Sequence, residues 1–277
     1  MPISLDDVRR QLAIANRILG NEGVIDAFGH ASVRHPGNPN RYFLARSRSP
    51  LFVEPADILE FDLDSEPVRP LTVQPYGERV IHGEIYKARP DVNAVVHHHS
   101  GAVLPFCMTG VPLVPLFHLG ATMGGTVPFW DQRDDFGDTN LLVIKPEEGA
   151  SLARALGNNW TVLMRRHGAT IAGTTLQEVV FRSINGCLNA EYQLRAMAIG
   201  TIGPLNAAEA HDAGAYNLQS RPMARAWEYW TLRLGERGIF PARKKTAAQR
   251  PARAAASRAK TKVAPRKKTA AKRGRKR

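Results

Sequence analysis

The segment ERVIHGEIYKARPDVNAVVHHHS, residues 78–100, decides the fold, because a helix, a turn and a strand follow one another within it. We predict a helix over residues 78–88, which the proline at position 90 ends, and a strand in the β-branched run that leads to His97. Alternate residues of a strand face the same side, so His97 and His99 present two imidazoles together. Two imidazoles at one strand end are typical of a metal site, which needs a third ligand from elsewhere in the chain.

His167 is the strongest candidate for that third ligand. It follows the apolar run Val162–Met164, which predicts a strand, and precedes Gly168, which lets the chain turn sharply. Histidines at strand ends also occur as polar edges or as hydrogen-bonded core residues, so the spacing alone leaves a metal site and a structural role open. We predict a structural role for His98, and a position next to the ligands rather than among them for His82.

Helices and strands are mixed along the rest of the chain, and the sequence has no internal repeat. A capping-box-like start at Ser4 opens a first helix, and a long helix capped by Thr174 or Thr175 is predicted to end near Ile199. Ser100 is expected to cap a further helix. Alternating or apolar runs predict strands at residues 24–33, 41–45, 58–63, 141–144 and 161–165. This order predicts one α/β layered domain whose apolar sheet is covered on both faces.

The length and composition allow a large buried core, since the chain has 277 residues and 43% of them are hydrophobic. No run approaches the roughly 18 apolar residues of a membrane span, and the acidic start Ser4–Asp7 differs from the basic start of a signal peptide. Only Cys107 and Cys187 are present, which is too few for a disulfide framework. We therefore predict a cytoplasmic protein without a membrane partner.

The net charge of +13 comes from the end of the chain. Sixteen of the 38 Lys and Arg residues lie in residues 243–277, which lack Asp and Glu, so 22 basic residues accompany 25 acidic ones in the rest. We predict one folded domain over residues 1–241 and a disordered Lys/Ala/Arg-rich basic tail over residues 242–277. Such a tail could bind nucleic acid weakly and in a salt-dependent way, or only increase solubility, and it has no aromatic residue to stack on bases.

The two stretches that carry the candidate histidines resemble the class II aldolase/adducin family. The similarity covers about residues 8–235 and combines a Glu before the turn, a His-x-His strand end and a later His-Gly pair. It implies a three-layer αβα sandwich with a central, largely antiparallel sheet, assembled as a homotetramer with active sites at subunit interfaces. It also implies that His97, His99 and His167 bind a divalent metal ion, Fe(II), Zn(II) or Mn(II), and that Glu78 is the catalytic carboxylate. From the residues alone, Glu78 could equally be a first-turn carboxylate that the helix dipole stabilises.

Departures from the sugar-phosphate aldolases of this family bear on the substrate. The loops that hold the substrate phosphate in those enzymes correspond here to Gly29-His30-Ala31-Ser32 and Tyr76-Gly77, so the phosphate cradle is lost. A polar loop with Arg48 and Ser49 remains, and Arg48 could pair with a carboxylate or make only a surface ion pair. We predict a small aromatic or unsaturated carboxylic acid without phosphate as the substrate, bound by Gly29, His30, Arg48 and Ser49.

With a carboxylate in place of a phosphate, the bond most readily cleaved is the one to that carboxylate. Residues 117–121 and 130–140 are similar to family members that decarboxylate hydroxy-carboxymuconic semialdehyde or dihydroxyphthalate, and His118 is the predicted acid or substrate contact there. We therefore predict a lyase that decarboxylates a hydroxy-aryl or ring-cleavage carboxylic acid through a metal-stabilised enolate, with Glu78 moving the proton.

A second function is compatible with the same ligands. The same branch resembles the non-haem Fe(II) oxygenases of aminocoumarin antibiotic biosynthesis, which oxidatively decarboxylate a prenylated 4-hydroxyphenylpyruvate to a hydroxybenzoate. Three histidines with open coordination positions hold Fe(II) as readily as a redox-silent ion, so the ligand type leaves both reactions open. A non-catalytic interaction module, as in cytoskeletal relatives, is disfavoured because Glu78 and all three histidines are present.

Overall fold

The centre of the molecule is a seven-stranded sheet, seen in a computed structural model that describes residues 4–241. The strands, in chain order, are β1 (His30–Arg34), β2 (Arg41–Ala45), β3 (Ile58–Asp62), β4 (Ala94–His98), β5 (Phe129–Trp130), β6 (Thr161–Met164) and β7 (Gly168–Gly173). They lie in the order β3-β2-β1-β4-β7-β6-β5. All neighbours pair antiparallel except β5 and β6, so the predicted central, largely antiparallel sheet is confirmed.

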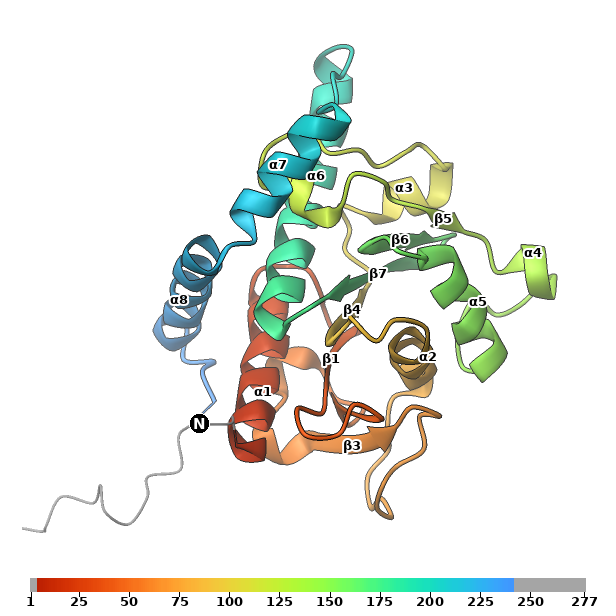
Figure 1. Cartoon of the computed structure of the whole chain (residues 1–277), viewed down its shortest axis with the longest axis vertical. Coiled ribbons are helices and arrows are strands. Elements are labelled where there is room, and N and C mark those ends of the chain that lie inside the picture. Colours follow the sequence, from red (N-terminus) through yellow and green to blue (C-terminus); the bar gives the residue numbers. More distant parts are fainter. Residues whose placement is uncertain (1–3, 242–277) are drawn as a thin grey trace, which may run out of the picture. The chain divides into compact units, whose positions relative to one another are not determined.

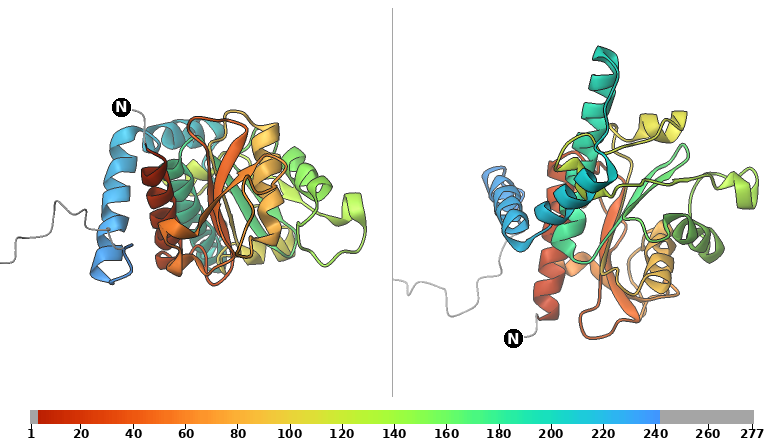
Figure 2. Two further views of the ribbon diagram at one scale, coloured as in Figure 1. Left: turned by 90° about the horizontal axis from the view of Figure 1, so that it is seen from below. Right: turned by 45° about the horizontal axis from the view of Figure 1, so that its top comes forward.

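Helices cover both faces of this sheet. In chain order they are α1 (Leu5–Asn21), α2 (Val80–Ala88), α3 (Leu104–Thr109), α4 (Arg133–Phe136), α5 (Pro146–Leu156), α6 (Leu176–Ile199), α7 (Ala207–Asn217) and α8 (Ser220–Glu236). α1 and α6 pack on one face and α2 and α5 on the other, while α8 packs on the outside of α1 and α6 (Figure 1). The view from below in Figure 2 shows the layers side by side. The α/β class and the αβα sandwich are confirmed.

The sheet is buried on both faces, because consecutive residues of a strand point to opposite helical layers. In β4, Val96 joins the apolar cluster under α1 and α6, whereas Val95 joins the cluster under α2 and α5. The same alternation sends His97 to the α2 side and His98 to the α6 side, where His98 Nε2 lies 4.0 Å from Cys187 Sγ. The end of β4 therefore presents His97 to the layer of α2 and His98 to the layer of α6.

The strand predicted at residues 141–144 is wrong. This segment is an irregular loop in which Leu141 has a φ of +68°, a left-handed conformation that interrupts an extended run. The N–H group of Val143 donates to the carboxylate of Glu78 at 3.1 Å instead of to a neighbouring strand. The loop therefore passes the start of α2 and contacts Glu78.

Among the other element boundaries that differ from the prediction, two are set by turns. The strand expected over residues 24–33 begins only at His30, because Gly29, with a φ of +96°, turns the chain just before it. The helix expected from Ser100 begins at Leu104, after a hydrogen-bonded turn that the Ser100 carbonyl closes. Both differences arise from turns that shorten the regular element without changing its place in the fold.

The basic tail predicted over residues 242–277, and with it the predicted nucleic-acid contact, lies outside the described residues. Within residues 4–241, no helix is both long and apolar enough to cross a membrane. The structural arguments below concern this part of the chain.

Candidate metal centre

Four side chains that lie far apart in the sequence meet at one end of the sheet. Glu78, His97, His99 and His167 each offer one ligand atom, and these atoms lie within 4.8 Å of one another. The Nε2 atoms of His97 and His99 are 3.0 Å apart. Glu78 lies 3.8 Å from His97 Nε2 through Oε2 and 3.4 Å from His167 Nε2 through Oε1. We call these four residues the candidate metal centre, and they are the three predicted metal ligands together with Glu78, one of the two predicted catalytic residues.

Strand pairing explains why His167 lies beside the other two histidines. β6 and β7 form a hairpin whose turn contains Arg166, with a φ of +54°, and then His167. Because β7 pairs antiparallel with β4, this turn lies next to the end of β4. His97 and His99 project there on the α2 side, so the sheet itself brings the three imidazoles together.

Gly168 allows this close approach, because a Cβ atom there would lie 2.2 Å from the carbonyl oxygen of His98 and 2.8 Å from Cδ2 of His99. We expect Gly168→Ala to lower the free energy of unfolding by about 3 kcal/mol, since the backbone of β4 must move away. Urea denaturation measures this change. Gly101→Ala is the matched control, because nothing lies within 4 Å of a Cβ atom there. Equal stability of the two variants would contradict the proposed crowding.

Glu78 reaches the histidines from a single 3-10 turn, η3 (Gly77–Arg79), which leads into α2. Its side chain is 14% exposed, and its Oε1 accepts the Val143 N–H at 3.1 Å. Burial raises the pKa of Glu78 to about 7, and the hydrogen bond from Val143 opposes this rise. A carboxyl group with such a pKa exchanges a proton near neutral pH, and Oε2 is the oxygen without a backbone hydrogen bond.

The donor atoms of the candidate metal centre fit a divalent cation. Among the described residues, the only buried side-chain nitrogen or oxygen atoms without a hydrogen-bond partner are the two ring nitrogens of His167. Such an unsatisfied atom costs about 1–3 kcal/mol, which a cation bound by the ring would offset. Burial lowers the pKa of His167 to about 4 and that of His97 well below its ordinary value, so both rings are neutral, as ligands must be. Three imidazoles and a carboxylate suit Fe(II), Zn(II) or Mn(II).

Two contacts that orient these side chains are not predicted from the sequence. Thr170 lies opposite His97 in the β4–β7 register, and its Oγ1 is 3.2 Å from His97 Nδ1, which leaves Nε2 for the metal centre. Val143 fixes Glu78 through its backbone N–H. Thr170 could have been identified from a predicted hairpin of β6 and β7 whose second strand pairs with β4. No local pattern indicates the contact of Val143.

Of the predicted substrate-binding residues, His30 and Gly29 lie beside the metal centre. His30 is opposite His97 in the β1–β4 register, and their ring centroids are 5.4 Å apart. A Cβ atom at Gly29 would lie 2.9 Å from the carbonyl oxygen of His97, so packing already explains the glycine. His82, on α2, lies with Nε2 2.7 Å from His30 Nδ1 and is not one of the four clustered residues.

Arg48 and Ser49 lie in the loop that follows β2, at the edge of the site. The Arg48 guanidinium pairs with Asp57, with Nη1 2.7 Å from Oδ2, so the ion pair considered as the alternative role is present. The backbone carbonyl of Arg48 accepts a hydrogen bond from the hydroxyl of Tyr76, and the ring centroid of Tyr76 lies 4.5 Å from that of His30. The loop is thus linked to the site through Tyr76, and a contact of Arg48 or Ser49 with substrate stays a prediction.

His118 is not brought to the metal centre within one chain. It is exposed just before the 3-10 turn η4 (Gly120–Met123), its ring contacts Phe117, and its carbonyl accepts the side-chain amide of Asn217 at 3.2 Å. In residues 4–241, no hydrogen bond, ion pair or ring contact joins His118 to the four clustered residues. Its predicted role as an acid or substrate contact therefore gains no support from the geometry of a single chain.

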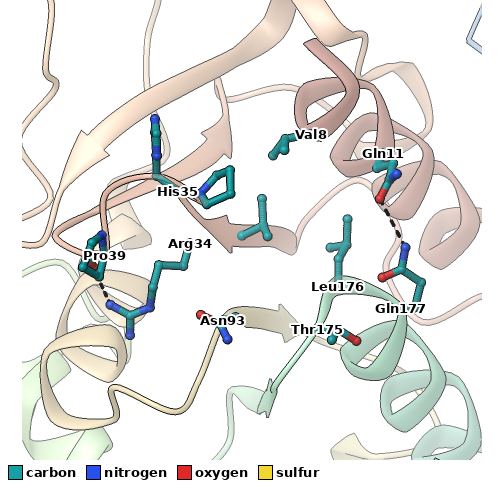
Figure 3. Close-up of a pocket in the computed structure, with 11 residues that line it drawn as sticks. Val8, Gln11, Arg34, His35, Pro39, Asn93, Thr175, Leu176 and Gln177 are labelled. Atoms are coloured by element: carbon teal, nitrogen blue, oxygen red, sulfur yellow. Dashed lines mark hydrogen bonds between the residues drawn. The ribbon is translucent and has the colours of Figure 1, made fainter. Parts of the chain in front are cut away.

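Figure 3 shows a groove of about 480 Å³, which lies at the start of β4, whereas the metal centre lies at its end. Asn93, which precedes β4, lines it together with Arg34 at the end of β1 and Gln177 at the start of α6. Its other lining residues are Val8, Gln11, Val33, His35, Pro36, Pro39, Thr175 and Leu176. The groove contains none of the four clustered residues, so we assign the candidate site to the metal centre.

Comparison with known proteins finds relatives over most of the chain. A family model described as "Class II Aldolase and Adducin N-terminal domain" matches residues 10–193. The chain is 34% identical to decarboxylase tropJ of Talaromyces stipitatus over 247 aligned residues. This alignment covers 80% of this chain and 92% of that protein. The chain is 28% identical to a 3,4-dihydroxyphthalate decarboxylase of Arthrobacter keyseri, over 84% of this chain and 96% of the relative.

Another relative carries a different named activity. A 4-hydroxy-3-prenylphenylpyruvate oxygenase/4-hydroxy-3-prenylbenzoate synthase of Streptomyces roseochromogenus is 28% identical over 193 residues, which is 67% of this chain and 66% of that protein. Among solved structures, an aldolase II superfamily protein from Pseudomonas syringae superposes with a TM-score of 0.71 at 20% identity, over 86% of this chain and 96% of its own. This structural likeness supports the fold, and the named relatives bear on the reaction.

Proposed function

This chain belongs to the class II aldolase and adducin family, and from that premise we propose that it is a metal-dependent decarboxylase of an aromatic or unsaturated carboxylic acid without phosphate. The chain is an enzyme, as its relatives named for decarboxylase and oxygenase activities are. The convergence of Glu78 with His97, His99 and His167 carries the proposal. Three neutral imidazoles beside one carboxyl group can hold a cation and move a proton at the same place.

His97, His99 and His167 would hold a divalent cation, which would act as a Lewis acid toward the substrate oxygen next to the scissile bond. Loss of CO₂ leaves the bonding electron pair on the substrate, where conjugation with that oxygen spreads the charge. The carbon then needs one proton, which the carboxyl group of Glu78 supplies from Oε2, leaving a carboxylate that solvent protonates again. In the metal-free chain, burial raises the pKa of Glu78 to about 7, which favours the protonated form that donates this proton.

We further propose that the substrate is a hydroxy-aryl or ring-cleavage acid whose acidic groups face His30 and the loop of Arg48 and Ser49. The position of His30 beside His97 supports this orientation. The guanidinium of Arg48 is already paired with Asp57, so a substrate carboxylate would have to share Arg48 with Asp57. Of the predicted residues, His30 is thus the one with the strongest structural support.

The assembly and location are part of the same proposal. We propose a homotetramer with its active sites at subunit interfaces, as the resemblance of the sequence implies. His118, exposed and outside the metal centre in one chain, would meet the substrate only if a second copy presented it. The cytoplasmic location still rests on the sequence, where the presence of only two cysteines favours it.

An oxidative decarboxylase is the second candidate function. The relative named as a prenylphenylpyruvate oxygenase favours it, and three histidines are as suitable for Fe(II) as for Zn(II). The two candidates differ in their need for oxygen. A simple decarboxylase releases CO₂ without any oxidant, whereas the oxygenase consumes O₂ for each CO₂ that it releases.

Metal analysis of protein purified without oxygen, followed by assays with and without O₂, tests the proposal. We expect about one divalent ion per chain, and release of CO₂ from hydroxylated aryl carboxylic acids, 3,4-dihydroxyphthalate among them, under strictly anaerobic conditions. Turnover of aryl 2-oxo acids that requires Fe(II) and takes up O₂ would replace the decarboxylase with the oxygenase. A metal-free protein that stays inactive when Fe(II), Zn(II) or Mn(II) is added would contradict both.

A further inference from the structure

A buried chain of four hydrogen-bonding side chains runs from the metal centre into the space between β1 and α2. His30 Nδ1 lies 2.7 Å from His82 Nε2, and His82 Nδ1 lies 2.6 Å from Ser32 Oγ. Ser32 Oγ lies 2.8 Å from the hydroxyl oxygen of Tyr86. All four residues are between 0% and 2% exposed, so protein atoms rather than water determine where their protons reside.

The hydrogen atoms along this chain have one consistent order. Burial raises the pKa of Tyr86, so its hydroxyl keeps its proton, and within the described residues Ser32 Oγ is the one acceptor at hydrogen-bond distance. Since Tyr86 donates to Ser32, Ser32 donates to His82 Nδ1. Burial lowers the pKa of His82 to about 3, so this ring carries a single proton, which is on Nε2 and is donated to His30 Nδ1.

His30 must then carry its own proton on Nε2. This nitrogen has no hydrogen-bond partner in residues 4–241. If it were also fully buried, it would be an unsatisfied buried atom, but among the described residues only the two ring nitrogens of His167 are of that kind. Nε2 of His30 therefore keeps contact with open space, although the residue is 2% exposed. The ring contacts those of His97 and Tyr76, at centroid distances of 5.4 and 4.5 Å, so His30 borders the metal centre.

We propose that Tyr86, Ser32 and His82 hold His30 as a neutral imidazole whose Nε2–H donates a hydrogen bond to an anionic oxygen of the bound substrate. The identity of that acceptor rests on the proposed function, in which it is an oxygen of the substrate carboxylate or of the adjoining phenolate or enolate. A neutral donor suits this place, because a cationic imidazolium beside His97 would repel the metal ion. His82 acts through His30 and is a positioning residue.

Hydrogen-bond donation, rather than proton transfer, is the role that the chain permits. If His30 gave up its Nε2 proton, each member would pass one proton along and Tyr86 would remain as a buried phenolate. Burial raises the pKa of Tyr86 and so opposes that outcome. The proton that the product needs therefore comes from Glu78, and His30 binds and orients the substrate.

The position of the His30 proton is measured directly by ¹⁵N NMR of the full-length chain, labelled at histidine and loaded with diamagnetic Zn(II). The His30 resonances are assigned by their loss in His30→Gln. We expect Nε2 to be protonated and Nδ1 unprotonated. A proton on Nδ1, a doubly protonated ring, or an Nε2 bound to Zn(II) would overturn the proposal. This readout needs no turnover, so it succeeds or fails independently of the proposed function.

Substitutions at His82 test whether that residue positions His30. His82→Gln keeps an N–H donor to His30 Nδ1, and His82→Leu removes it. We expect the first to keep the Nε2 proton on His30, and the second to give both tautomers and to raise KM about tenfold or more while kcat changes less than about threefold. If His82→Leu does not fold, Ser32→Ala interrupts the same chain and should give the same mixture. An unchanged His30 tautomer in the Leu and Ala variants would show that His82 does not position it.

Discussion

Replacement of His167 by alanine is expected to abolish metal binding without destabilising the metal-free protein. Truncation of the ring loses favourable packing. It also removes two buried nitrogen atoms without hydrogen-bond partners, each of which lowers the free energy of unfolding by about 1–3 kcal/mol, so the two effects offset each other. The affinity for Zn(II) should fall by at least about 100-fold, because residues that merely orient a ligand already contribute 10–100-fold. Isothermal titration calorimetry measures this affinity, and CO₂ release should become undetectable.

Thermal unfolding gives an independent readout of the same variant. A cation present at about 1,000 times its dissociation constant stabilises the wild-type chain by about 4 kcal/mol, and a 100-fold weaker affinity in His167→Ala removes about 2.7 kcal/mol of this gain at the same concentration. His211→Ala is the matched control, since the side chain of His211 is 80% exposed and pairs only with Asp212 in the described residues. A His167→Ala protein that keeps both stoichiometric metal and the stabilisation would remove His167 from the ligands.

The pair His97 and His99 could be predicted from the sequence because the two-residue period of a strand is local. Whatever the wider fold, alternate side chains face one way, and the neighbouring run of apolar residues identifies the strand. His167 required a second step, since only the pairing of β7 with β4 brings its turn to the end of β4. The family resemblance supplied that step, whereas spacing alone left a structural role for these histidines open.

The loop of residues 141–144 shows why the rest could not be predicted. Its apolar composition is typical of a strand, but Leu141 adopts a φ of +68°, and Val143 donates to a carboxylate 65 residues earlier in the chain. Such a conformation depends on a partner that no local pattern specifies. The chain of His30, His82 and Ser32 is similar, because its members come from different elements and meet only after β1 and α2 have packed. Long-range polar contacts of this kind are decided by tertiary structure.

Glu78→Gln is expected to lower kcat by about 1,000-fold or more while the metal content stays near that of the wild type. Glutamine keeps an oxygen that can accept the Val143 N–H at the position of Oε1, so the shape of the site is preserved. It cannot deliver a proton from the position of Oε2, and general acid catalysis contributes about 10²–10⁴-fold. Steady-state kinetics and metal analysis of the same preparation measure the two effects. Glu147→Gln, on the exposed first turn of α5, is the control.

The stability of the metal-free Glu78→Gln protein distinguishes a proton carrier from a structural carboxylate. Burial raises the pKa of Glu78 from 4.5 to about 7, so the folded state favours the protonated form and loses stability as pH rises from about 4.5 to about 7. Glutamine has no charge to bury. At pH 8 we therefore expect the variant to be more stable than the wild type by about 2 kcal/mol in the presence of a chelator. If Glu78 were retained for structure, the variant would instead be less stable than the wild type. If the variant lost its metal, Glu78 would be a metal ligand. Lost turnover together with gained stability is the result that a residue kept for chemistry at the expense of folding must give.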